Sequence, residues 1–240
     1  MKACIIIPTY NEKENIKPLI DELEKMFLKV SDWNVKILVV DDRSPDGTGD
    51  IVKKLQHHYS NIFLISGEKK GLGEAYKRGF QYVLDHIETD YVVQMDADFQ
   101  HKPKDILRLF DKAVAGYEFI IGSRYIDTSD YSSWSLKRKI FSHGANFIAR
   151  RIAGIQNVND CTSGFRCIST KFLKSFDLKV LRSSGYAFQM SMLHIASTKK
   201  ASILEIPIHF PGRAKGTSKL RFKDIVEFFF DALKLRGKKY

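Results

Sequence analysis

Short apolar runs alternate with segments of helical periodicity along the first half of the chain. Unbroken apolar runs predict buried strands, and apolar residues that recur every three or four positions predict amphipathic helices. The predicted strands are 3–9, 35–40, 62–66, 91–95 and 119–122, and the predicted helices cover 16–27, 48–59, 76–87 and 106–113. Strands separated by helices of this length form right-handed parallel βαβ units. The pattern therefore predicts an α/β fold, with helices on both faces of a mostly parallel sheet.

The second half is less regular. Its predicted elements are a basic helix at 134–153, strands at 165–168 and 202–210, a helix at 186–197 and a last helix from about Leu220. In the first half, Asn15 is expected to cap the first helix, with Pro18 in that helix's first turn. Because no repeat or linker is visible, we expect one catalytic domain over 1–219 and an amphipathic, basic helix and tail over 220–240.

Composition changes this picture little. The chain of 240 residues is 44% hydrophobic and 28% charged, which excludes collagen-like, disordered and low-complexity proteins. Its three cysteines lack Cys-x-x-Cys spacing, which predicts a reducing setting without disulfide framework or zinc site. No stretch reaches the roughly 18 apolar residues of a membrane span, so no transmembrane helix is expected.

Charge divides the chain in two. The formal net charge is +11, but residues 1–131 carry −4 and residues 132–240 carry +15. The stretch 132–154 holds five basic residues and no acid. This asymmetry indicates an anionic partner for the second half, such as nucleic acid, phosphate-bearing substrates or an acidic membrane, unless the charge is a solvated face.

Carboxylates follow three of the predicted strands. Glu12 comes after the first strand, Asp41 and Asp42 end the second, and Asp96 and Asp98 follow the fourth. Ligands of open α/β sheets bind at the carboxyl ends of the strands. Two aspartates two positions apart can converge on one Mg²⁺, which leaves its other positions to water and substrate phosphates. The acids therefore predict a metal site for a diphosphate, with turn or cap acids as the alternative.

Other catalytic motifs are absent from the sequence. Gly71-Leu72-Gly73 lacks the third glycine of the dinucleotide fingerprint and does not follow the first strand. There is no Walker A motif, no Gly-x-Ser-x-Gly and no His-Glu-x-x-His.

Longer motifs run through nearly the whole chain. They are Ile-Pro-Thr-Tyr-Asn-Glu at 7–12, Val-Asp-Asp-x-Ser-Pro-Asp-Gly-Thr at 40–48, Gly-Leu-Gly-x-Ala at 71–75, Met-Asp-Ala-Asp-Phe-Gln-His at 95–101, Gly-Ser-Arg-Tyr at 122–125, Thr-Ser-Gly-Phe-Arg at 162–166, Gly-Tyr-Ala-Phe-Gln at 185–189 and Arg213-x-x-Gly216-x-Ser218-Lys219. Together they resemble the family 2 glycosyltransferases of the GT-A fold. Among these, the chain is most similar to the polyprenyl- or dolichyl-phosphate mannose synthases (dolichol-phosphate mannosyltransferases).

The resemblance implies roles for individual residues. Those expected to bind the donor, GDP-mannose, are Pro8, Tyr10, Glu12, Val40, Asp42, Asp96, Ala97, Asp98, Gln100, Arg213 and Lys219. Those expected to hold a divalent cation, Mg²⁺ or Mn²⁺, are Asp96, Asp98 and Gln100. Those expected to bind the acceptor phosphate are Arg124, Arg138 and Ser142. The expected catalytic residues are Asp98, Arg124, Arg213 and Lys219.

The implied reaction is inverting, metal-dependent transfer of mannose from GDP-mannose to dolichyl (polyprenyl) phosphate. The metal, Arg213 and Lys219 are expected to neutralise the leaving diphosphate. A phosphate acceptor is already anionic near pH 7, because its second pKa is about 6. It therefore needs no general base. It needs cations that bind it, and the basic helix supplies them.

One position departs from the family pattern. Where many relatives are expected to have Gln-x-Glu, this chain has Gln189-Met190-Ser191. If that glutamate acts as a base elsewhere in the family, Ser191 favours a pre-ionised acceptor. If it organises the acidic site, Ser191 changes the affinity for metal or donor. Both hypotheses stay open.

The last helix combines a wide apolar stripe with surrounding basic residues. The stripe consists of Phe222, Ile225, Val226, Phe229 and Leu233, widened by Phe228, Phe230 and Leu235. It predicts an interfacial helix on an anionic membrane or on a small membrane-anchoring subunit, with a core-capping helix as the alternative. With the resemblance, this implies a peripheral protein on the cytoplasmic face of a membrane, the endoplasmic reticulum in a eukaryote.

Two alternative functions compete with this reaction. The same fold serves UDP-glucose in a dolichyl-phosphate glucose synthase, or another acceptor in other family 2 enzymes. The basic half could instead bind nucleic acid without catalysis. No RNA-binding aromatic motif, helix-turn-helix or zinc knuckle accompanies the charge, so no nucleic-acid partner is expected.

Overall fold

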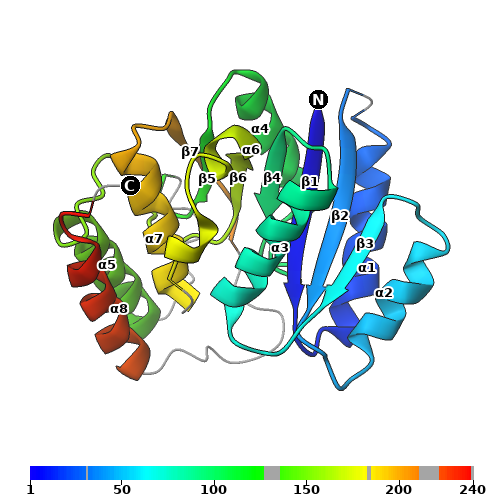
Figure 1. Cartoon of the computed structure of the whole chain (residues 1–240), viewed down its shortest axis with the longest axis horizontal. Coiled ribbons are helices and arrows are strands. Elements are labelled where there is room, and N and C mark those ends of the chain that lie inside the picture. Colours follow the sequence, from blue (N-terminus) through cyan, green and yellow to red (C-terminus); the bar gives the residue numbers. More distant parts are fainter. Residues whose placement is uncertain (31, 127–135, 183–184, 211–221, 239–240) are drawn as a thin grey trace.

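One mixed sheet runs through the middle of the molecule. The computed structural model describes residues 1–30, 32–126, 136–182, 185–210 and 222–238. Within these ranges the strands are β1 (Lys2–Thr9), β2 (Asn34–Asp41), β3 (Ile62–Ser66), β4 (Tyr91–Gln94), β5 (Phe119–Ser123), β6 (Arg166–Ser169) and β7 (Ile203–Pro207) (Figure 1). Their spatial order is β3-β2-β1-β4-β6-β5-β7. Among them only β6 runs antiparallel to its neighbours, which confirms the mostly parallel sheet expected from the sequence.

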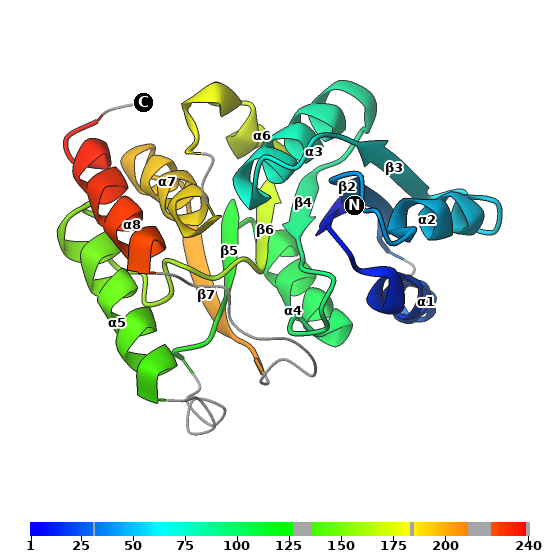
Figure 2. The ribbon, with the colours of Figure 1, turned by 90° about the horizontal axis from the view of Figure 1, so that it is seen from below.

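Helices cover both faces of this sheet (Figure 2). One face carries α1 (Lys13–Phe27), α2 (Thr48–Gln56) and α4 (Pro103–Val114). The other carries α3 (Leu72–His86), α5 (Leu136–Arg151), α6 (Thr170–Leu173), α7 (Gly185–Thr198) and α8 (Phe222–Leu235). A short 3-10 helix, Leu178–Val180, precedes α7. The sheet is therefore the middle layer of three.

The two apolar layers follow from the alternation of side chains along each strand. In β1, Ile5 and Ile7 face the layer of α1 and α4. Cys4 and Ile6 face the layer of α3 and α7. All four are fully buried, as expected for a parallel strand that helices cover on both sides.

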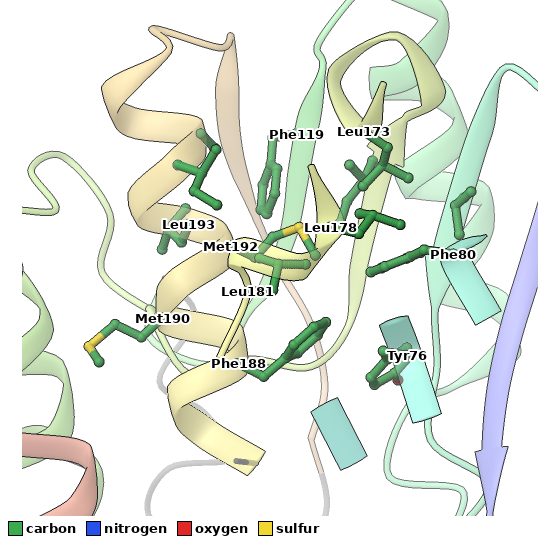
Figure 3. Close-up of a cluster of buried hydrophobic side chains, with 14 of the residues drawn as sticks. Tyr76, Phe80, Phe119, Leu173, Leu178, Leu181, Phe188, Met190, Met192 and Leu193 are labelled. Carbon is green, nitrogen blue, oxygen red and sulfur yellow. The ribbon is translucent and has the colours of Figure 1, made fainter. Parts of the chain in front are cut away.

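Aromatic rings join α3 to α7. Tyr76 and Phe80 of α3 face Phe188 of α7 (Figure 3). The rings of Tyr76 and Phe188 are nearly parallel, with their centroids 5.6 Å apart. Gly79 lets α3 approach the sheet, because a Cβ at this position would lie 2.9 Å from Cγ2 of Ile6.

Several predicted boundaries were wrong. The first helix begins at Lys13 with Glu12 at its N-cap, so Asn15 lies inside the first turn and donates to Glu12 Oε2 at 2.7 Å. Pro18 is consequently the sixth helical residue and not part of the first turn. It is tolerated because it is exposed, and water can satisfy the carbonyl that loses its partner. The helix expected at 48–59 ends at Gln56.

Candidate active site

Two loops, after β1 and after β2, are joined by hydrogen bonds. The buried carboxylate of Asp41 accepts from the hydroxyl of Thr9 at 2.9 Å, and from the hydroxyl and amide of Ser44 at 2.6 and 2.9 Å. The Glu12 amide donates to Oγ1 of Thr48 at 3.0 Å. Asp41 is therefore a structural carboxylate that holds these loops at the edge of the sheet.

Asp42, the next residue, has a different partner. Arg78 of α3 donates to Asp42 Oδ1 at 2.6 Å. Pro8 and Val40 lie opposite each other in β1 and β2, directly before this edge. The Val40 side chain is fully buried, so it can meet a ligand only through its backbone.

Tyr10 completes this part of the site. Nζ of Lys69, from the loop between β3 and α3, lies 3.3 Å from the centroid of the Tyr10 ring, which is a cation–π contact. The structure thus brings the five predicted donor residues of the first two strands to one edge of the sheet: Pro8, Tyr10, Glu12, Val40 and Asp42. Their role in binding the donor stays a prediction.

Asp96 and Asp98 lie in the loop after β4, the strand that pairs with β1 in parallel. Oδ1 of Asp98 accepts from the Gln100 amide at 3.1 Å, and Phe99 takes the left-handed conformation, with a φ of 61°. The Asp96 side chain is 37% exposed, whereas Ala97 and Gln100 are buried. The loop therefore holds Asp96 where solvent and ligands can reach it.

His101 holds this acidic loop in place, a role that was not predicted for it. Its Nδ1 accepts a hydrogen bond from the Asp96 amide at 3.0 Å, and its ring stacks on Phe165 with the centroids 4.9 Å apart. Burial lowers the pKa of His101 to about 4. The ring is therefore neutral near pH 7, with its proton on Nε2, which leaves Nδ1 as the acceptor that the amide needs. The sequence feature that could have indicated this role is the position of His101 directly after the acidic motif.

The side chains of this loop suit a hard divalent cation. Carboxylate and amide oxygens are the ligands that Mg²⁺ and Mn²⁺ prefer, and Asp96, Asp98 and Gln100 carry them. Across the described ranges, no group of three or more His, Cys, Asp or Glu side chains is placed to hold a metal. A cation here would have the two aspartates as its carboxylate ligands, with Gln100 beside them, and would leave positions for substrate oxygens, which is the usual arrangement for Mg²⁺.

A second polar cluster lies at the end of β5. Arg124 donates to the carboxylate of Asp160 from Nε at 2.7 Å and from Nη2 at 2.6 Å, and its backbone amide donates to the same carboxylate at 3.0 Å. Asp160 is fully buried. Burial favours the neutral acid, but the Arg124 guanidinium and the backbone amides of Arg124 and Thr162 together outweigh it and lower the pKa of Asp160 below its ordinary value. The two charges therefore form one buried pair.

Asp160 was missed by sequence reasoning, because nothing in its spacing links it to Arg124. Its own loop is held by Glu205 of β7, which accepts from the amides of Asn159 and Asp160 at 2.7 and 2.8 Å. Arg124 is thus positioned by a buried carboxylate. Because the Asp160 carboxylate partly balances the guanidinium charge, a phosphate bound by Arg124 meets a smaller net positive charge.

Tyr125 connects Arg124 to Ser142. The Tyr125 hydroxyl donates to Oγ of Ser142 on α5 at 2.5 Å. One turn later, Asn146 donates to the Ser142 carbonyl at 3.0 Å and accepts from the Cys161 amide at 2.8 Å. Two of the predicted acceptor residues, Arg124 and Ser142, are therefore close neighbours.

Phe210 lies between the two clusters. Its ring centroid is 5.6 Å from that of His101, and the guanidinium carbon of Arg124 lies 5.4 Å from it. The acidic loop and the Arg124 cluster are therefore parts of one site. The remaining predicted residues lie outside what the structure describes, namely the side chain of Arg138 and the whole of Arg213 and Lys219.

Ser191 is fully buried in α7. Its hydroxyl donates to the Phe188 carbonyl at 2.9 Å and accepts from the Arg182 amide at 3.2 Å. It therefore holds the backbone of Arg182 against α7. These contacts leave both hypotheses about the missing glutamate open.

The helix α8 has two apolar sides. Phe228, Ala232 and Leu235 are buried in the core. Helix α5 lies beside α8 (Figures 1 and 2). Among the side chains that the structure describes, the exposed large apolar ones on these two helices are Val226, Phe229, Phe230, Leu233, Leu136, Ile140 and Phe147. The helix thus caps the core and also presents an apolar outer surface. Within the described ranges, no helix combines the length and apolar character needed to cross a bilayer.

Known proteins match this chain over nearly its whole length. The model of Glycosyl transferase family 2 matches residues 4–176. The polyprenol monophosphomannose synthase of Mycolicibacterium smegmatis is 35% identical over 231 residues, which are 95% of this chain and 84% of that protein. The undecaprenyl-phosphate mannosyltransferase of Micrococcus luteus is 35% identical over 221 residues, 92% of this chain and 88% of the relative. A dolichol-phosphate mannosyltransferase of Pyrococcus furiosus is 33% identical over 229 residues, 95% of this chain but only 62% of its own length.

Solved structures share the fold. Glucosyl-3-phosphoglycerate synthase from Mycobacterium tuberculosis, in complex with Mn²⁺ and UDP-glucose, superposes with a TM-score of 0.65 at 17% identity, over 98% of this chain and 77% of its own. Mannosyl-3-phosphoglycerate synthase from Rubrobacter xylanophilus gives the same TM-score and identity, over 98% of this chain and 72% of its own. At such identity the likeness concerns the fold alone. The family match and the three relatives carry the assignment: the chain belongs to glycosyl transferase family 2 and is a glycosyltransferase.

Proposed function

We propose that the enzyme transfers mannose from GDP-mannose to a polyprenyl (dolichyl) phosphate, with inversion at the anomeric carbon. The observation that carries this proposal is the similarity, over 92–95% of the chain, to three proteins: one is named a polyprenol monophosphomannose synthase, and two are named mannosyltransferases of dolichol or undecaprenyl phosphate. The two neighbouring polar clusters support it, because the carboxylates of one suit a metal-bound donor diphosphate and the arginine of the other suits an acceptor phosphate.

The donor belongs on the acidic side of the site. The loops after β1 and β2 offer Tyr10, Glu12 and Asp42 to the nucleotide, with Pro8 and the Val40 backbone beneath them. Asp96, Asp98 and Gln100 are the residues that would hold a divalent cation, Mg²⁺ or Mn²⁺, for the diphosphate. Such a cation supplies positive charge to the departing diphosphate.

The acceptor phosphate belongs on the Arg124 side. A phosphate oxygen attacks the anomeric carbon as the bond from that carbon to the diphosphate breaks. No base has to remove a proton from an already ionised phosphate. Arg124, positioned by Asp160, and Ser142, positioned by Tyr125, seat this phosphate together with Arg138. Arg213 and Lys219, from the segment before α8, are assigned to the leaving group.

The lipid tail requires an apolar surface beside the phosphate site. The exposed apolar side chains of α5 and α8 offer one, and Ser142 stands on α5 itself. Lys234, Arg236 and Lys238 add positive charge at the end of α8. We therefore assign residues 1–219 to the catalytic domain and 220–240 to a segment that meets the cytoplasmic face of a membrane, or a small membrane subunit.

A direct assay tests this proposal. The purified chain is incubated with Mg²⁺ or Mn²⁺, labelled GDP-mannose and dolichyl phosphate in vesicles, and the lipid is then extracted. We expect labelled lipid with the wild type, none with Asp98→Asn, and an unchanged yield with Asp50→Asn, a surface aspartate on α2 paired with Lys53. Absence of labelled lipid under either metal would overturn the proposal, and label from UDP-glucose alone would replace the sugar.

A further inference from the structure

A layer of buried polar side chains lies directly behind the acidic loop. Gln94, the last residue of β4, stands opposite Arg166 of β6 in the sheet, so both side chains project from the same face. Arg166 is fully buried, and its Nη1 donates to the backbone carbonyl of Gln189 on α7 at 2.8 Å. The layer therefore spans β4, β6 and α7 on the face that α3 and α7 cover.

Several atoms of this layer lack hydrogen-bond partners within the described part of the chain. They are both amide atoms of Gln94, both amide atoms of Gln189 and Nε of Arg166. Gln189 is only 2% exposed. Buried polar groups are almost always paired in native proteins, so an exception at one place needs a functional or structural reason.

The Gln189 amide is directed at the acidic loop. A Cβ added at Gly164 would lie 3.5 Å from Nε2 of Gln189, 3.8 Å from Cε1 of His101 and 3.9 Å from Oδ2 of Asp96. These three groups therefore converge on one point. Phe188, the neighbour of Gln189, faces Tyr76 (Figure 3). Burial, and after it the charge of Asp96, raises the pKa of Tyr76.

We propose that Gln189 is a positioning residue for Asp96, whose carboxylate it orients through its side-chain amide when the donor diphosphate and its cation bind. This inference rests on the proposed function, because that function supplies the cation and the diphosphate. The amide hydrogen bond to the carboxylate leaves the other carboxylate oxygen directed outward. Groups that orient a metal ligand in this way typically change metal affinity by 10–100-fold when they are removed.

Gln189→Met tests the inference, because it keeps the length of the side chain and removes the amide. The variant loses no hydrogen bond that the described structure contains, so we expect the midpoint of thermal unfolding to rise by about 2–4 °C. In the presence of saturating GDP, we expect the dissociation constant of Mn²⁺, measured by electron paramagnetic resonance, to rise about tenfold or more. Stability and metal affinity would then move in opposite directions, which a purely structural glutamine does not explain.

Two further variants keep the test decisive. Ser197→Ala removes another buried unpartnered oxygen of α7, about 12 Å further along the helix, and should leave Mn²⁺ affinity unchanged. Gly164→Ala places a methyl group at ordinary contact distance between Gln189 and Asp96, and should weaken Mn²⁺ binding without lowering stability.

The outcomes separate this inference from the proposed function. Wild-type binding of Mn²⁺ with GDP, together with wild-type affinity in both Gln189→Met and Gly164→Ala, would overturn the role of Gln189 alone. A wild type that binds neither Mn²⁺ nor GDP would overturn both. A loss of stability in Gln189→Met, with unchanged Mn²⁺ affinity in Gly164→Ala, would make Gln189 structural.

Discussion

The two halves of the site use their carboxylates in opposite ways. After β4, Asp96 is held through its backbone, by His101, and its side chain reaches solvent. After β5, Asp160 is fully buried, and its carboxylate is taken up by Arg124. The acidic loop after β4 therefore keeps negative charge at the surface of the site, whereas Asp160 uses its charge internally, as Asp41 and Asp42 at the end of β2 also do.

One edge of a sheet can thus receive a metal-bound diphosphate beside an anionic acceptor. A surface carboxylate attracts a cation, and a buried one holds an arginine in place without competing for the ligand. The two arrangements meet at Phe210, which touches both His101 and Arg124. Substitution of individual carboxylates tests whether some attract a cation while others hold parts of the protein in place.

Asp160→Asn should have the largest effect on stability. It leaves the Arg124 charge buried without its partner, which typically costs about 3–5 kcal/mol. Urea denaturation measures this loss, with Asp111→Asn, an exposed aspartate on α4, as the control that should stay near wild type. A loss below about 1 kcal/mol would show that the two halves do not differ as described.

The same pair predicts a dependence on pH. The pKa of Asp160 is lowered in the folded protein, so its contribution is complete above the unfolded value near 4 and disappears as the pH falls through the folded value. The stability gap between wild type and Asp160→Asn should therefore be constant near pH 7 and shrink below about pH 4. A gap that widened in acid would contradict the assignment of a charged Asp160.

Asp98→Asn should leave stability nearly intact and remove activity. The asparagine Oδ1 still accepts from the Gln100 amide, so the loop keeps its shape. Loss of a group that stabilises charge in the transition state typically lowers kcat by about 10²–10³. Initial rates of lipid mannosylation measure this effect, and a variant with wild-type rates would remove Asp98 from the chemistry.

Asp41→Asn, at the end of β2, should instead lower stability and leave the activity of the folded enzyme nearly unchanged. Its amide group cannot accept from both the hydroxyl and the backbone of Ser44 while Thr9 also donates, so a buried donor loses its acceptor. We expect a loss of about 1–3 kcal/mol in urea denaturation. Activity should fall only as far as the fraction of folded protein falls, and a large activity loss at full folding would make Asp41 a ligand.

Tyr125→Phe should have the smallest effect. It removes the hydrogen bond to Ser142, worth about 0.5–1.5 kcal/mol. We expect the KM for the polyprenyl phosphate to rise a few-fold while the KM for GDP-mannose stays constant. Steady-state kinetics with each substrate varied in turn distinguish the two, and an equal rise in both values would count against an acceptor site here.

The sequence pattern was enough to predict the layered α/β fold. Unbroken apolar strands such as 3–9 and the helical stripes between them left few arrangements that bury both faces of a parallel sheet. It also located Asp42, Asp96 and Asp98, because residues that follow parallel strands gather at one edge. The antiparallel β6 was not predicted, since periodicity reports which face of a strand is buried and not its direction.

The partner of each carboxylate, by contrast, is set by the packing of the folded chain. Asp41 and Asp42 are neighbours in sequence, yet one holds a loop and the other meets Arg78. Asp160 reaches Arg124 across 36 positions. Such partners come from strands and loops brought together by the packing of the whole core. The motif therefore marks where the site lies, and burial and hydrogen bonding determine whether each acid faces a ligand or the protein.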